Sequence, residues 1–126
     1  MTTKELLEVY FKLNDRFDFL WNFYTVFIVA LGGYLLSEDT QVLDDSQKII
    51  LICGYLLFTF MNIYGLLVTS HSLRITAKEI YRTVTDTSEL AIVTSTVRKN
   101  HAMDKWAAFL IHGTLLPLFI WVVLSK

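Results

Sequence analysis

Three long stretches of this chain contain no charged side chain. They cover residues 19–36, 49–68 and 106–124, and they are 18, 20 and 19 residues long. Because an α-helix rises about 1.5 Å per residue, each stretch is long enough to cross a hydrocarbon core roughly 30 Å thick. The pattern predicts an all-α integral membrane protein with three transmembrane helices, in one domain that covers residues 1–126.

Apolar residues outside the first two stretches continue with the period of a helix. In the first helix the steps between them alternate between four and three, at Leu6, Tyr10, Leu13, Phe17, Leu20 and Tyr24. After the second stretch the same spacing places on one face Leu73, Ala77, Ile80 and Val84. We expect one helix over about 3–36 and a second helix that continues several turns past residue 68.

The connection over 69–105 contains one segment whose structure is ambiguous. The Thr, Asp and Ser residues over 83–88 favour a break, because their side chains compete for backbone hydrogen bonds. Asp86 and Glu89 have the spacing of a capping box, which predicts a further helix over about 87–100. The many β-branched residues in that helix leave a short strand as the alternative.

The basic residues are distributed asymmetrically about the three stretches. With three crossings, nine Lys and Arg residues fall on one side of the membrane, and only Lys48 and Lys126 fall on the other. Because basic flanks are retained in the cytoplasm, we expect a cytoplasmic N-terminus, an external C-terminus and a cytoplasmic connection over 69–105. The small size and the absence of a cleavable signal pattern favour a multi-pass protein of a bacterial inner membrane.

The composition argues against several classes of function. The chain is 54% hydrophobic and its formal net charge is −1, whereas nucleic-acid binders usually carry a concentrated basic excess. It has no phosphate-binding glycine loop, no cysteine pair, no helical pair of histidines and no nucleophile-elbow serine. We therefore expect no nucleic acid, no catalysis, no metal and no cofactor, with the lipid bilayer as a partner.

The uncharged polar residues within the spans are the remaining candidates for a site. Counting along each helix places Asn22, Asn62 and His112 roughly 5 to 9 Å from the cytoplasmic edge, in the inner leaflet. Such groups either hydrogen-bond between helices or line a hydrated constriction that takes ions, a small ligand or a proton. Ligation of haem by His112 in an oligomer is a third reading. The full set comprises Asn22, Thr25, Tyr55, Thr59, Asn62, His112 and Thr114.

Four further residues mark the ends and the shape of the spans. Pro117 removes a backbone donor from the third span, which predicts a kink there. Asp18 and Asp104 lie at the cytoplasmic mouths of two spans, where they form either an acidic ring in an oligomer or pairs with neighbouring basic residues or helix caps. Tyr24 lies near a span end, where aromatic rings anchor at the membrane interface.

These observations favour a small homo-oligomeric channel or pore for ions or small solutes. The helical period places on one face of the second span a polar stripe of Tyr55, Thr59, Asn62 and Thr69. Three helices bury little surface in a monomer, and cyclic symmetry would gather copies of one such stripe around an axis. The alternative is a regulatory or scaffolding accessory subunit that docks a cytosolic or membrane partner through its cytoplasmic helices. In that alternative, the candidate contacts are Leu73, Ile80 and Val84.

Overall fold

The computed structural model describes residues 1–84, 87–97 and 102–126, and the side chains of all of these except 39, 87 and 102–104. Its elements in chain order are α1 (Thr3–Leu35), the 3-10 helix η1 (Glu38–Thr40), α2 (Asp45–Thr83), α3 (Thr87–Thr96) and α4 (Ala102–Leu124). Every regular element in these residues is a helix and none is a strand, which confirms the all-α prediction. The ambiguous segment over 87–100 contains α3, and its residues 98–100 lie outside the described part.

Helix α1 begins with the capping box that its sequence allows. The Thr2 hydroxyl accepts from the Glu5 backbone N–H at 3.2 Å, and the Glu5 carboxylate accepts from the Thr2 backbone N–H at 2.8 Å. This second bond lowers the pKa of Glu5 below its ordinary value of 4.5. The helix then continues for 33 residues, about 50 Å, without a break.

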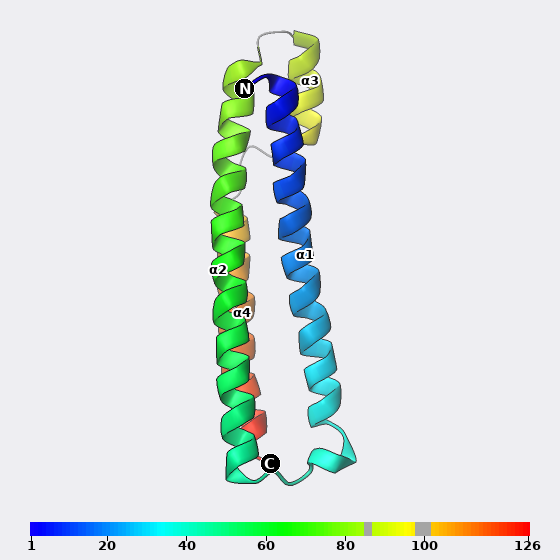
Figure 1. Ribbon diagram of the computed structural model, residues 1–126, viewed down its shortest axis with the longest axis vertical. Helices are drawn as coiled ribbons and strands as arrows, with labels where there is room; N and C mark the ends of the chain where they lie inside the picture. Colours follow the sequence, from blue (N-terminus) through cyan, green and yellow to red (C-terminus); the bar gives the residue numbers. More distant parts are fainter. Residues whose placement is uncertain (85–86, 98–101) are drawn as a thin grey trace.

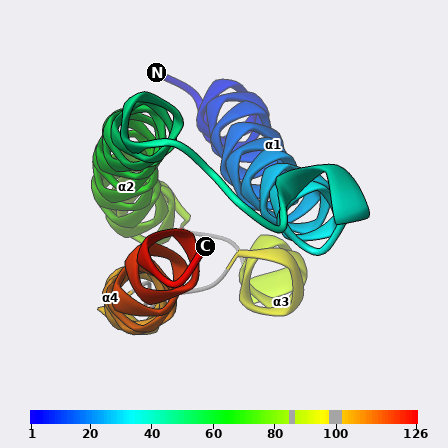
Figure 2. The ribbon, with the colours of Figure 1, turned by 90° about the horizontal axis from the view of Figure 1, so that it is seen from below.

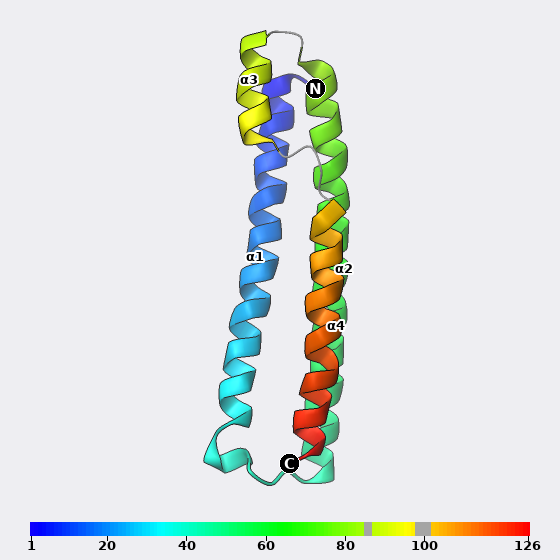
Figure 3. The same ribbon diagram turned by 180° about the vertical axis from the view of Figure 1, so that it is seen from behind.

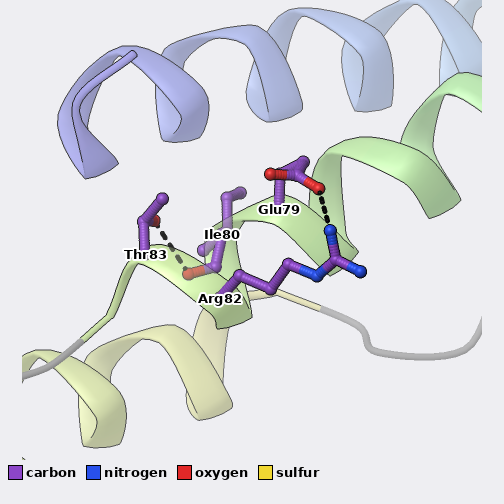
Figure 4. Close-up of polar contacts among 4 residues, drawn as sticks. All are labelled: Glu79, Ile80, Arg82 and Thr83. Carbon is purple, nitrogen blue, oxygen red and sulfur yellow. Dashed lines mark hydrogen bonds and ion pairs between the residues drawn. The ribbon is translucent and has the colours of Figure 1, made fainter.

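Helix α2 has the same kind of start and a defined end. At its start Asp44 and Gln47 form a reciprocal capping box. At its end the Thr83 hydroxyl donates to the Ile80 carbonyl at 3.1 Å, and Arg82 pairs with Glu79 at 3.0 Å (Figure 4). The 39 residues of α2 span about 58 Å, so both long helices exceed the uncharged stretches within them.

The helices form two layers. In one layer, α1 and α2 lie side by side and antiparallel along their whole length (Figure 1). The second layer lies on one face of this pair and contains α4 and α3 (Figures 2 and 3). Helix α4 covers α2 at the end where the C-terminus lies, and α3 lies at the opposite end, beside the start of α1. The Tyr81 hydroxyl of α2 donates to the Val97 carbonyl at 3.0 Å, which fixes the segment that follows α3.

Two separate apolar cores hold the layers together. The first lies at the α3 end and contains Leu6, Tyr10, Phe17, Leu66, Leu73, Ala77, Ile80, Val93, Val97 and Ala108. The second lies at the C-terminal end and contains Leu35, Leu43, Tyr55, Phe119 and Val123. The predicted apolar rows therefore face inward at Leu6, Tyr10 and Phe17, and at Leu73, Ala77 and Ile80. Of the polar candidates, Asn62 and His112 are buried between the two cores, and Tyr55 belongs to the second core.

Large apolar side chains cover the outside of the long helices. Val29, Phe60 and Leu110 are 70%, 73% and 68% exposed, one on each of α1, α2 and α4. Three helical segments are long and apolar enough to cross a membrane, namely Thr3–Leu35, Asp45–Thr83 and Lys105–Leu124. Both features are compatible with a multi-pass membrane protein, because lipid tails are a good solvent for exposed apolar side chains.

Candidate functional site

The His112 side chain lies at the centre of the polar region, with only 1% of its surface exposed. It follows Ala108 by one turn and precedes Phe119 by two turns, so all three share the buried face of α4. Its Nδ1 atom lies 2.8 Å from the Ala108 carbonyl oxygen, and its Nε2 atom lies 3.0 Å from Asn62 Oδ1. The imidazole thereby joins α4 to α2.

Asn62 extends this connection to the third long helix. Its amide Nδ2 donates to the Leu20 carbonyl oxygen of α1 at 3.1 Å, and the residue is 4% exposed. One turn further along α2, Gly65 packs closely on Leu20, since a Cβ at Gly65 would lie 3.2 Å from Leu20 Cδ1. This close approach of α1 and α2 brings the main-chain carbonyl within reach of the amide.

Aromatic rings enclose the imidazole on its α1 side. The Tyr24 ring stacks on His112 with 4.0 Å between centroids, and Trp21 lies at 5.8 Å. The Tyr24 hydroxyl is 3.3 Å from the Tyr55 hydroxyl of α2, and the Tyr55 ring stacks on Phe119 of α4 at 4.0 Å. A continuous set of polar and aromatic contacts therefore runs from Asn62 to the second apolar core.

The polar stripe of α2 is buried along its length. Tyr55, Thr59, Asn62 and Thr69 are between 1% and 4% exposed. Among the residues that the structure describes, the hydroxyls of Thr59 and Thr69 are buried and have no hydrogen-bond partner. We call the group Tyr24, Tyr55, Asn62 and His112 the polar layer, because its hydrogen bonds and ring stacking connect α1, α2 and α4.

The polar candidates on α1 lie on its opposite face. Asp18, Asn22 and Thr25 are all exposed, and their spacing of four and three places them on one side of the helix. The Thr25 hydroxyl donates to the Trp21 carbonyl at 2.9 Å, and Asp18 accepts from Asn14 Nδ2 at 3.4 Å. Within the described contacts, the Asn22 amide has no partner. We call Asp18, Asn22 and Thr25 the outer stripe.

The remaining candidates are on α4 and do not join either group. Thr114 is exposed, and its hydroxyl donates to the Leu110 carbonyl at 2.7 Å. Pro117 lies inside α4, which continues through it to Leu124, so the kink stays a prediction. Asp104 lies near the start of α4, and its side chain is outside the described part of the chain. Nowhere in the described residues do three His, Cys, Asp or Glu side chains gather to hold a metal.

A cleft of about 220 Å³ separates α1 from α4 beside the second core. Ile28 and Leu31 of α1 line one side, Leu118 and Val122 of α4 line the other, and Tyr55 is the one residue with a polar side chain in the lining. The cleft suits an apolar occupant and offers no chemistry of its own. By contrast, the polar layer joins α1, α2 and α4 through polar contacts.

Sequence reasoning missed two members of this region. Tyr24 was not among the expected site residues, and the structure buries it at 2% exposure with its ring stacked on His112; its place at the membrane interface stays a prediction. The periodic apolar row that ends at Tyr24 is the signal that identifies it as a buried residue. The Leu20 carbonyl could not be found in this way, because a main-chain acceptor leaves no trace in the side-chain pattern.

Comparison with known proteins adds no identity to this geometry. No family model, no curated protein and no solved structure matches the chain.

Proposed function

We propose that this chain is a multi-pass membrane protein that assembles with copies of itself into a channel for ions or small solutes. The observation that carries the proposal is the outer stripe, which places Asp18, Asn22 and Thr25 on an exposed face of α1. An amide that faces lipid without a partner loses its hydrogen bonds to water, which costs about 1–3 kcal/mol or more. Contact with other copies around a wet axis removes this cost.

The polar layer has a different role in this proposal. Tyr55, Asn62 and His112 are buried inside one copy and are hydrogen-bonded to groups of that same copy. Bonds of this kind contribute about 0.6–2 kcal/mol each between membrane helices. We therefore assign the polar layer to holding the three spans together. Of the polar residues predicted for a pore, those of the outer stripe are the ones that we place at the channel axis.

The charge of the outer stripe indicates the kind of solute. Asp18 lies one turn before Asn22 and is exposed. With a cytoplasmic N-terminus, a ring of Asp18 carboxylates would stand at the inner mouth, and rings of acidic side chains favour cations over anions. The Asn22 amides and Thr25 hydroxyls would follow at greater depth, where they replace part of the hydration of a permeating ion.

The test is ion flux through purified protein reconstituted into liposomes. We expect cation flux from the wild type, a loss of cation preference in Asp18→Asn, and a strong loss of flux in Asn22→Leu. Thr114→Val is the matched control, because Thr114 is also exposed within a span but lies on α4. A wild type that supports no flux, or an Asn22→Leu variant that conducts normally, contradicts the proposal.

A second candidate function is the accessory subunit, and one observation favours it. On α3, Leu90 and Ile92 are 43% and 62% exposed, whereas Val93 is buried against the first core. Of the contacts expected from the sequence, Leu73 and Ile80 are 1% and 0% exposed, so they serve the core and are not free to bind a partner. The docking surface of this candidate therefore moves to α3.

A photocrosslinking residue in place of Ile92 tests this candidate in intact cells. We expect one defined partner to be captured at this position, and no partner when the same residue replaces the buried Ala77. Loss of that capture when Leu90 is replaced by Ser would support docking through α3. Equal capture at both positions contradicts it.

A further inference from the structure

Three polar contacts follow one another through the polar layer. The Ala108 carbonyl oxygen lies 2.8 Å from His112 Nδ1, and His112 Nε2 lies 3.0 Å from Asn62 Oδ1. Asn62 Nδ2 then lies 3.1 Å from the Leu20 carbonyl oxygen. Both ends of the row are main-chain carbonyl oxygens, which accept hydrogen bonds and never donate them.

Neutral His112 cannot supply hydrogen atoms to all three contacts. A neutral imidazole carries one N–H and one lone pair. If the N–H is at Nδ1, the Nε2 lone pair faces Asn62 Oδ1, and both of these atoms are acceptors. If the Asn62 amide is flipped, its NH2 group donates to Nε2, but its oxygen then faces the Leu20 carbonyl oxygen, which is also an acceptor. If the N–H is at Nε2, the Nδ1 lone pair faces the Ala108 carbonyl. In each neutral form, one close contact joins two acceptors with no hydrogen between them.

The imidazolium form satisfies the whole row. With both ring nitrogens protonated, Nδ1 donates to Ala108, Nε2 donates to Asn62, and the Asn62 amide donates to Leu20. Burial away from water disfavours a cation here, and the aromatic rings offset part of that cost: the Tyr24 ring stacks on the imidazole at 4.0 Å and Trp21 lies at 5.8 Å. Aromatic faces attract cations, and this attraction strengthens when water is excluded.

We propose that His112 is a proton-binding site whose occupied form locks α4 onto α1 and α2. The step is the addition of one proton from water to the free ring nitrogen lone pair, with no change in oxidation state. Release of the proton leaves one acceptor–acceptor contact in the row, which weakens the connection between the helices. The site stands independently of the proposed channel, because all of its ligands belong to a single copy.

The groups that face the imidazole are otherwise uncharged near neutral pH. From α1 these are the Tyr24 phenol and the Trp21 ring, and from α2 the Asn62 amide, with the Tyr55 phenol paired to Tyr24. From α4 the facing group is the Ala108 carbonyl. A histidine is the side chain that ordinarily changes charge between about pH 5 and pH 8, so protonation of His112 is the event that alters this layer.

Nitrogen NMR of the full-length protein in lipid nanodiscs, with ¹⁵N-labelled histidine, tests the proposal. As the pH falls from about 8 to about 5, we expect the His112 signals to change from one protonated ring nitrogen to two. In Asn62→Leu, which removes the acceptor at Nε2, the proton affinity of His112 should fall tenfold or more. The exposed His71 lies outside this row and serves as an internal control, so its signals should be the same in both proteins at each pH.

A second variant keeps the test decisive if Asn62→Leu does not fold. Asn62→Asp retains the size of the side chain and adds a carboxylate, so it should raise the proton affinity of His112 tenfold or more. A His112 that keeps one protonated nitrogen throughout this pH range would overturn the proposal. So would a proton affinity that neither substitution at Asn62 changes.

Discussion

His112 of α4 and Asn62 of α2 are 50 residues apart in the chain, and they meet through Nε2 and Oδ1 at 3.0 Å. The contact lies between two apolar cores that share no residue. Through the Leu20 carbonyl it also reaches α1, so one pair of side chains connects α1, α2 and α4. An imidazole and an amide would be costly in either apolar core, and their mutual hydrogen bond is what allows them to be buried here.

Replacement of Asn62 by Leu should destabilise the protein by about 1–3 kcal/mol, because the change leaves His112 Nε2 and the Leu20 carbonyl without this partner. Unfolding in mixed SDS micelles measures the free energy of unfolding. Thr114→Val is the control, since the Thr114 hydroxyl is exposed and bonds only to its own helix, and we expect less than about 0.5 kcal/mol from it. Equal effects of the two substitutions would contradict the role given to Asn62.

The hydroxyl pair of Tyr24 and Tyr55 predicts a non-additive pair of substitutions. Each change to Phe removes one partner of the 3.3 Å contact but keeps the ring and its stacking, so each should cost about 0.5–1.5 kcal/mol. The double variant should cost less than the sum, because the second change removes a hydroxyl that has already lost its partner. A strictly additive double-mutant cycle would show that the two hydroxyls do not interact.

The capping box at the start of α1 predicts a local dependence on pH. The hydrogen bond from the Thr2 backbone lowers the pKa of Glu5 below its ordinary value of 4.5. The cap therefore stabilises α1 fully when the pH is above that ordinary value. This stabilisation is lost as the pH falls through the lowered value in the folded state. Circular dichroism or amide exchange of the first turn should show fraying in acid for the wild type. Glu5→Gln should show a weaker pH dependence, and an identical acid response would contradict the cap.

The topology predicts opposite accessibility for two ends of α2. In a Cys53→Ser background, which removes the single native cysteine, cysteines are introduced as Asp44→Cys or Arg82→Cys. A maleimide that does not cross membranes should label position 44 in intact cells, and should label position 82 only after the membrane is opened. Labelling of both positions from the same side would show that α2 does not cross the bilayer in the way proposed.

The sequence was sufficient for much of the fold because its helical period is strong. The row from Leu6 to Tyr24 correctly predicted a single long helix, and four members of that row are buried, namely Leu6, Tyr10, Phe17 and Tyr24. The spacing of Tyr55, Thr59, Asn62 and Thr69 likewise predicted one face of α2, and all four are buried there. Periodicity determines which residues share a face, and this property is local to each helix.

The identity of the neighbour of each face could not be read from the sequence. The polar stripes of α1 and α2 were candidates for the same pore lining, yet α2 turns its stripe toward α1 and α4 while Asn22 and Thr25 point outward. Which face meets which helix depends on the packing of two chain segments, here on the close approach at Gly65. The sequence also could not predict that α3 ends at Thr96, because helix and strand propensities compete in that segment.

The most direct test of the account is crosslinking between copies through the outer face of α1. In the Cys53→Ser background, Asn22→Cys places a thiol in the outer stripe, and Thr114→Cys places one on the exposed surface of α4. We predict that a short bismaleimide joins copies in native membranes through position 22 and leaves the protein with a thiol at position 114 monomeric on denaturing gels. Crosslinking through position 114 but not through position 22, or no crosslinking at either position, would contradict an assembly with α1 at its axis.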